Sequence, residues 1–210
     1  EILIGLVGSE MCIRDRLSEV SNENQEEIST ILEQAEKLDF LIQSLVKLSR
    51  MESGIIAVHS EDTTIKQMLE SIQQQFNVKV REKNITLSLC DTDLHVLCDS
   101  KWTVEALGNI VDNAIKYTAC GGNVQIKVEQ YSFFVKIDII DDGIGIEKEE
   151  IPKIFGRFYR SLSVADQLGV GIGLFLAREI IQAQKGYIKV TSKRGKGSTF
   201  SVFLPIAKKE

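Results

Sequence analysis

The sequence predicts an α+β protein: a two-layer α/β sandwich with a mixed sheet, preceded by a long helix. Segments with helical spacing of apolar residues alternate with segments in which apolar and polar residues strictly alternate. These segments lack the regular spacing of βαβ units, which disfavours a doubly wound parallel sheet. A composition of 43% hydrophobic and 26% charged residues over 210 residues is typical of a folded globular chain.

Residues 1–16 differ from the rest of the chain, because they show neither a helical nor a strand period. They resemble a translated adapter sequence, and we expect them to be a non-native scar or disordered. The alternative is a native signal or membrane-proximal remnant. No function is assigned to this segment.

A long amphipathic helix is predicted from Asn22 to about Ser53. Its apolar residues follow the 3-4-3-4 spacing of a coiled-coil or bundle seam: Ile28, Ile31, Ala35, Leu38, Ile42 and Leu45. Further leucines widen the stripe, which favours a four-helix bundle. We expect residues 17–54 to form one helix of a dimerisation domain and residues 55–62 to be a connector.

The elements of the sandwich are predicted within residues 63–206, followed by a tail at 207–210. Helices are expected at 65–76, 99–117 and 171–184. Strands are expected at 85–89, 124–128, 135–139, 187–192 and 199–204, with Pro205 closing the last.

Composition excludes several classes of function. A net charge of -5 disfavours nucleic acid as a partner. The four cysteines, at positions 12, 90, 98 and 120, show no metal-ligand spacing and fit a reducing cytosol. The two histidines, His59 and His95, are too few for a zinc site and are expected to have no catalytic role. The longest apolar stretch, 2–7, is far shorter than the roughly 20 residues that cross a bilayer, so we expect a cytoplasmic polypeptide.

Glycines cluster in three short motifs: DDGIG at 141–145, GVGIG at 169–173 and GKGST at 195–199. Such clusters indicate a backbone that approaches a ligand closely or adopts positive φ. The second motif opens into a predicted helix, whose free N–H groups would suit a phosphate. One GxGxG motif alone is weak support for a nucleotide site.

Side chains near these glycines strengthen the nucleotide interpretation. Asn109 and Asn113 share one face of a predicted helix, and carboxamide oxygens are suitable ligands for Mg²⁺. Lys116 adds a charge for a phosphate, and Asp141 can accept a hydrogen bond from an amine such as that of adenine. Taken singly, each of these residues could be an ordinary surface or turn residue.

Five motifs together resemble the N, G1, F, G2 and G3 boxes of sensor histidine kinases. They are NIVDNAIKYT (109–118), DDGIG (141–145), IFGRFYR (154–160), GVGIGL (169–174) and GKGSTF (195–200). Residues 36–54 also resemble the second helix of that family's dimerisation and phosphoacceptor domain. The resemblance implies an α/β sandwich that binds ATP and Mg²⁺ under a mobile lid at 161–168.

The resemblance also implies roles, position by position. Catalytic roles fall on Asn109, as the Mg²⁺ ligand, and on Lys116, Arg157 and Arg160. Nucleotide contacts fall on Asn113, Tyr117, Asp141, Gly143, Gly145, Gly169, Gly171, Gly173, Leu174 and Thr199. Gly143 and Gly145 would let the chain pass close to the base.

Two departures from the family pattern matter. Gly156 stands where many relatives have an acidic residue, and the H box that carries the phosphoacceptor histidine is absent. We therefore expect a truncated gene product that binds ATP without phosphorylating itself. In the longer parent protein, the resemblance implies a homodimeric helical bundle, membrane anchoring, and transfer of the phosphoryl group through a histidine to a response regulator.

Two alternatives stay open. A gyrase-like or chaperone-like ATPase would place a glutamate base where this chain has Asn109, and would lack the helix at 28–48. A nucleotide-free scaffold that only dimerises through 22–53 would not need Asp141, Asn109 or the glycine motifs.

Overall fold

The computed structural model describes most of the chain from residue 58 onward and part of the preceding helix. The described residues are 28–32, 34–35, 38–39, 41–43, 45–46, 49, 58–161 and 170–207. The chain divides into two compact units, one of which holds residues 57–167 and 171–210. Residues 1–16, for which we expected a scar, lie outside the described residues.

Every described position between 28 and 49 is helical, as the apolar spacing predicts. Along this helix Ile31, Leu38, Ile42 and Leu45 have exposed side chains. Among the residues that the structure describes, no helix is both long and apolar enough to span a bilayer.

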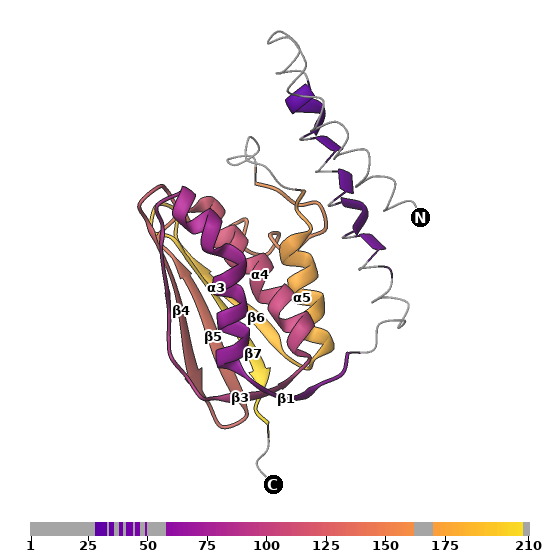
Figure 1. Ribbon diagram of the computed structural model, residues 1–210, viewed down its shortest axis with the longest axis vertical. Coiled ribbons are helices and arrows are strands. Elements are labelled where there is room, and N and C mark those ends of the chain that lie inside the picture. Colours follow the sequence, from indigo (N-terminus) through magenta and orange to yellow (C-terminus); the bar gives the residue numbers. More distant parts are fainter. Residues whose placement is uncertain are drawn as a thin grey trace. The chain divides into compact units, whose positions relative to one another are not determined.

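The larger unit is built on a five-stranded mixed sheet with the order β2-β4-β5-β7-β6 (Figure 1). Its strands are β2 (Thr86–Leu89), β4 (Asn123–Gln130), β5 (Phe134–Asp141), β6 (Tyr187–Ser192) and β7 (Ser198–Pro205). The β2–β4 pair is parallel, and the other three pairs are antiparallel. The predicted mixed sheet is therefore confirmed.

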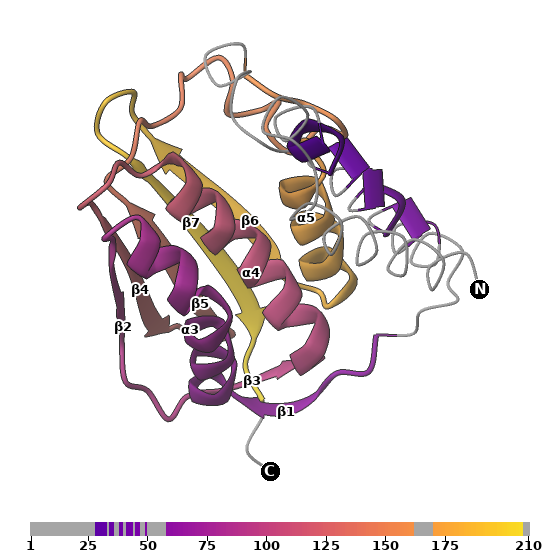
Figure 2. The same cartoon turned by 45° about the horizontal axis from the view of Figure 1, so that its top comes forward.

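Three helices cover one face of this sheet, as both views show (Figures 1 and 2). They are α3 (Ile65–Glu82), α4 (Ser100–Tyr117) and α5 (Gly173–Ala183). Apolar side chains from every second position of β5 and β7, including Ile137, Ile139 and Val202, are fully buried beneath them. This burial of one sheet face against amphipathic helices gives the two-layer sandwich its core.

Two short strands were not predicted. β1 (Glu61–Thr64) and β3 (His95–Cys98) form a separate antiparallel two-stranded sheet. β1 includes the last two residues of the expected connector at 55–62. Strands of four residues give too short an alternation to be recognised in a sequence.

The helix boundaries required two corrections. α3 extends to Glu82, six residues beyond the last predicted position, and ends where Asn84 adopts a left-handed φ of 52°. α5 begins at Gly173 and not at Gly171, because Gly171 has a φ of 77° that is incompatible with a right-handed helix.

Candidate functional site

Helix α4 carries four of the predicted site residues along one side. Asn109, Asn113, Lys116 and Tyr117 are spaced by three and four residues, and each is half-buried. The helix begins directly after Asp99, whose carboxylate accepts a hydrogen bond from the Trp102 N–H at 3.2 Å. One element thus holds the amides, the cation and the aromatic ring in a fixed relation.

Asp141 is the last residue of β5, and its carboxyl group is buried. One oxygen, Oδ1, accepts hydrogen bonds from the backbone N–H of Gly143 at 3.0 Å and of Ser198 at 3.2 Å. Burial raises the pKa of this carboxyl, while the two N–H groups act in the opposite direction. Both bonds use the same oxygen, so Oδ2 is the atom of Asp141 suited to a ligand.

The neighbouring Asp142 has a different role. It is exposed, and its two carboxylate oxygens accept bonds from the backbone N–H and the side-chain amide of Asn123, at 2.9 and 2.8 Å. These bonds lower the pKa of Asp142. Asp142 therefore fastens the end of β5 to the start of β4, and does not belong to the site.

The 141–145 motif packs against the end of α4. A β-carbon at Gly143 would lie 2.5 Å from the carbonyl oxygen of Tyr117, and the Ile144 N–H donates to that oxygen at 3.3 Å. Gly145 has a φ of 67° and lies against the backbone of Lys193. Both positions therefore require glycine because the protein's own backbone lies too close for a side chain. The resemblance had implied that these glycines let the chain pass close to the nucleotide base.

The start of α5 approaches α4 at Asn109. A β-carbon at Gly173 would lie 3.1 Å from Oδ1 of Asn109. The Asn109 amide nitrogen donates to the carbonyl oxygen of Glu105 at 3.0 Å, which turns Oδ1 toward Gly173. A neutral oxygen presented at a helix start matches the ligand that Mg²⁺ accepts beside phosphate oxygens.

Positive charge gathers beside the end of α4. Burial lowers the pKa of the Lys116 ammonium, and the nearby Arg160 guanidinium lowers it further. Burial raises the pKa of the Tyr117 hydroxyl, and the charge of Arg160 acts to lower it. Arg160 therefore lies within electrostatic range of both residues, and a polyanion between these cations would relieve their repulsion.

Arg157, the other arginine of the 154–160 motif, is placed differently. The guanidinium of Arg157 lies 4.7 Å from the ring centre of Phe175, and that of Arg178 lies 5.4 Å from the same ring. Arg157 thus packs on the first turn of α5, where Leu174 is half-buried. A β-carbon at Gly171 would lie 2.6 Å from the Tyr159 carbonyl oxygen, so Gly171 is in contact with the 154–160 motif.

Two predictions in this region lie outside the described residues. They are Gly169 and the lid, of which the structure describes only Ser161.

Thr199 is not brought to the site. Alternation along β7 places its side chain on the sheet face opposite to Asp141, with Ile140 and Thr191 as its cross-strand partners. Ser198, which the sequence analysis missed, pairs with Asp141 and donates to it through its N–H. The alternation of Phe200, Val202 and Leu204 toward the core contained the signal that would have identified Ser198.

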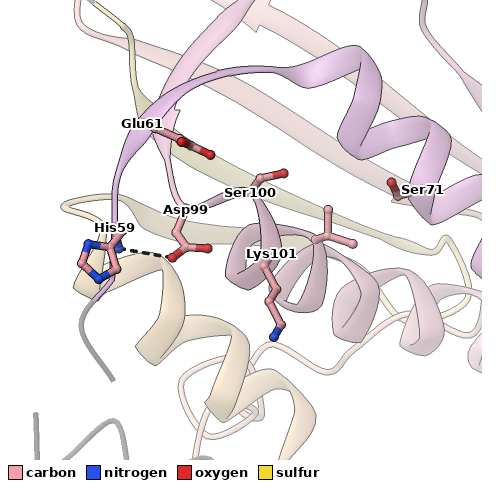
Figure 3. Close-up of a pocket in the computed structure, with 7 residues that line it drawn as sticks. His59, Glu61, Ser71, Asp99, Ser100 and Lys101 are labelled. Atoms are coloured by element: carbon pink, nitrogen blue, oxygen red, sulfur yellow. Dashed lines mark hydrogen bonds between the residues drawn. The ribbon is translucent and has the colours of Figure 1, made fainter. Parts of the chain in front are cut away.

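A hollow lies at the N-terminal end of α4, away from Lys116 and Tyr117 (Figure 3). Its lining residues are His59, Glu61, Ser71, Asp99, Ser100, Lys101 and Val104. None of the predicted site residues lines it, and the carboxylates of Glu61 and Asp99 make it unsuited to a polyphosphate. Within the described part of the chain, no group of three histidine, cysteine or acidic side chains could hold a metal ion.

Comparison with protein families tests the predicted family. Residues 98–208 match the family described as histidine kinase-, DNA gyrase B-, and HSP90-like ATPases. The chain belongs to this family. The match includes α4, the end of β5 and all three glycine motifs, so the family predicted from these motifs is confirmed.

Two curated relatives are sensor kinases. The chain is 33% identical to the sensor histidine kinase WalK of Bacillus subtilis over 82% of this chain and 29% of WalK. It is 30% identical to the sensor protein kinase PmrB of Pseudomonas aeruginosa over 81% of this chain and 36% of PmrB. The chain therefore spans about a third of the length of these relatives.

Two solved structures share the fold. Full-length ShkA in complex with AMPPNP superposes with a TM-score of 0.77 at 20% identity, over 98% of this chain and 46% of ShkA. The histidine kinase ThkA in complex with the response regulator TrrA superposes with a TM-score of 0.72 at 20% identity, over 98% of this chain and 57% of ThkA. These likenesses support the predicted fold class.

Proposed function

We propose that this chain binds ATP with Mg²⁺ beside α4 and serves as the phosphotransfer domain of a sensor histidine kinase. One observation carries the proposal: two of the glycine motifs contact the helix that holds the amides and the lysine. Gly143 lies against Tyr117, and Gly173 lies against Asn109. Residues far apart in the sequence thus meet along one helix face, as a nucleotide site requires.

Each side chain then has a distinct task. The Oδ1 atom of Asn109 would hold Mg²⁺, which neutralises charge on the phosphate oxygens when it is bound. Lys116 and Arg160 would bind the phosphates through their N–H groups. Oδ2 of Asp141 would accept a hydrogen bond from the adenine amine.

The residues favour phosphoryl transfer over hydrolysis. Asn109 is a carboxamide and cannot act as a general base for water, which weighs against a gyrase-like or chaperone-like hydrolase. In the transfer, an imidazole nitrogen attacks the γ-phosphorus, the P–N bond forms and the P–O bond to ADP breaks. The imidazole proton leaves to solvent.

The acceptor would be a histidine that this sequence does not contain. Its two histidines are exposed, and the His95 ring pairs with Asp62 at 2.5 Å. We therefore expect no stable label on His59 or His95 after incubation with γ-labelled ATP. Acid-labile, base-stable label on either one would contradict this.

Calorimetry tests the binding itself. The non-hydrolysable analogue AMPPNP should bind the chain more tightly with Mg²⁺ than without, and Asn109→Ala should remove most of that difference. The matched control is Asn77→Ala, an exposed asparagine on α3 that should leave it unchanged. A chain that binds no analogue would favour the nucleotide-free scaffold.

The remaining roles concern the longer protein. The exposed stripe of Ile31, Leu38, Ile42 and Leu45 supports pairing with further helices in a homodimeric bundle, which sedimentation equilibrium would detect. The phosphorylated histidine would pass its phosphoryl group to a response-regulator aspartate, as the ThkA–TrrA complex suggests by analogy. Anchoring of the longer protein in the membrane would leave this region in the cytoplasm.

A further inference from the structure

Lys83, the residue directly after α3, places its ammonium group at the C-terminal end of α4. Its Nζ donates to three carbonyl oxygens, those of Ile115 at 2.9 Å, Lys116 at 2.8 Å and Thr118 at 3.0 Å. An ammonium has three N–H donors, so all of them are used here. The last carbonyls of a helix lack partners within the helix and carry partial negative charge. Lys83 therefore caps α4 from a different helix.

The backbone around Lys83 is fixed to the loop that follows α4. The carbonyl oxygen of Lys83 accepts a bond from the Gly121 N–H at 3.1 Å, and the Thr86 N–H donates to Gly122 at 2.9 Å. Asn84, with its left-handed φ of 52°, ends α3 between these two bonds. The ammonium is thus carried by a backbone that is tied on both sides, unlike that of an ordinary surface lysine.

The cap includes the backbone of two residues of the proposed site. Lys83 binds the carbonyl of Lys116 and the carbonyls on either side of the Lys116–Tyr117 pair. The Tyr117 carbonyl accepts a bond from the Ile144 N–H at 3.3 Å. Four successive carbonyls, 115–118, are therefore occupied, three of them by one ammonium. This arrangement fixes the backbone from which the Lys116 and Tyr117 side chains project.

We propose that Lys83 is a positioning residue for nucleotide binding: its ammonium holds the end of α4 so that Lys116 and Tyr117 face the nucleotide. Lys83 does not itself contact the nucleotide. This inference rests on the proposed function. If Lys83 were merely structural, its replacement would lower the stability of the chain but leave the affinity of the folded protein unchanged.

Lys79 provides a matched control. It lies one helical turn earlier on α3, and both Lys79 and Lys83 lower the pKa of Lys116 through their charge. The Nζ of Lys79 pairs with Asp112 at 2.5 Å and caps no helix. Lys79→Met therefore removes a comparable charge near the site and leaves the cap intact.

The experiment measures Mg²⁺–AMPPNP affinity of the full 210-residue chain by calorimetry, below the unfolding temperature of every variant. We expect Lys83→Met to weaken binding at least tenfold more than Lys79→Met. In a Lys116→Met background the same replacement should cost several-fold less, because one of the two side chains that Lys83 positions is gone. Equal losses for Lys83→Met and Lys79→Met, or an undiminished loss in the Lys116→Met background, would overturn the proposal.

Two further measurements keep the outcome decisive. If Lys83→Met does not fold, Lys83→Gln, whose amide has two donors, is tested by the same criteria. If the parent chain binds no AMPPNP, the proposed function fails, and hydrogen exchange without nucleotide still tests the cap. Faster exchange of the amides of 115–122 in Lys83→Met than in Lys79→Met would support the cap. Equal exchange in the two variants would refute it.

Discussion

Replacing Asp141 by asparagine separates the structural task of this side chain from its proposed binding task. The carboxylate oxygen Oδ1 accepts the N–H groups of Gly143 and Ser198, whereas Oδ2 is proposed to accept the adenine amine. In Asp141→Asn the amide oxygen can still accept both N–H groups. The amide nitrogen then replaces Oδ2, and it donates where the nucleotide also donates.

The expected magnitudes follow from these bonds. A hydrogen bond to a charged group contributes roughly 1.5–3 kcal/mol, so Asp141→Asn should weaken AMPPNP binding by roughly 10- to 150-fold. Its free energy of unfolding should change by less than about 1 kcal/mol. Asp141→Ala leaves the buried N–H groups of Gly143 and Ser198 without an acceptor, which should cost about 2–6 kcal/mol of stability.

The pH dependence supplies an independent check. Burial raises the native pKa of Asp141 above its ordinary value of 3.8, so the unfolded chain releases this proton first as pH rises. The native chain then binds more protons than the unfolded chain, and stability falls with rising pH until the native pKa is passed. Asp141→Asn lacks this group and should lose that part of the slope.

Calorimetry and urea unfolding between pH 4 and 7 measure both effects. Undiminished AMPPNP affinity in Asp141→Asn would refute the assignment of Oδ2 to the nucleotide. A large loss of stability in Asp141→Asn would show that the two N–H bonds depend on the negative charge, contrary to the geometric argument.

Two other predictions concern the framework of the site. Gln184→Leu should cost about 2–4 kcal/mol in urea unfolding, because the part-buried Asp99 N–H and the buried Thr103 hydroxyl lose their shared acceptor. The exposed Gln182→Leu is its control, and equal stabilities would contradict the prediction. Gly145→Ala should reduce both stability and AMPPNP affinity, because its β-carbon would meet the Lys193 backbone at a φ of 67°. Gly195 is also at positive φ, but a β-carbon there would meet open space. Gly195→Ala therefore measures the backbone strain without the close contact, and it should lower stability less than Gly145→Ala does.

The sequence predicts the central elements well because their patterns are long. β4 and β5 each alternate over eight residues, and α4 combines a capping aspartate with apolar residues on one face. The four-residue strands β1 and β3 offer no such pattern. The end of α3 was missed because 77–82 has few apolar residues, although Asn84 is a common residue at a helix end.

The site was predicted less completely, because side-chain direction depends on strand register. The sequence motif suggested Thr199, but the pairing of Asp141 with Ser198 turns Thr199 to the other face. The cap by Lys83 is a contact between residues 32 or more positions apart, which no local pattern in one sequence reveals. The sequence indicated a close approach of the backbone at Gly143 and Gly145, but not that the neighbour is the protein's own backbone.

The adjacent aspartates at the end of β5 make the site sensitive to the length of that strand. Asp141 faces inward and Asp142 binds Asn123, so two chemically identical neighbours differ only in which way the pleat directs them. Deletion of a single residue earlier in this strand would bring Asp142 into the inward register of Asp141 and would turn Asp141 to the opposite face, at the register of Ile140. The length of the strand therefore determines which carboxylate faces the site.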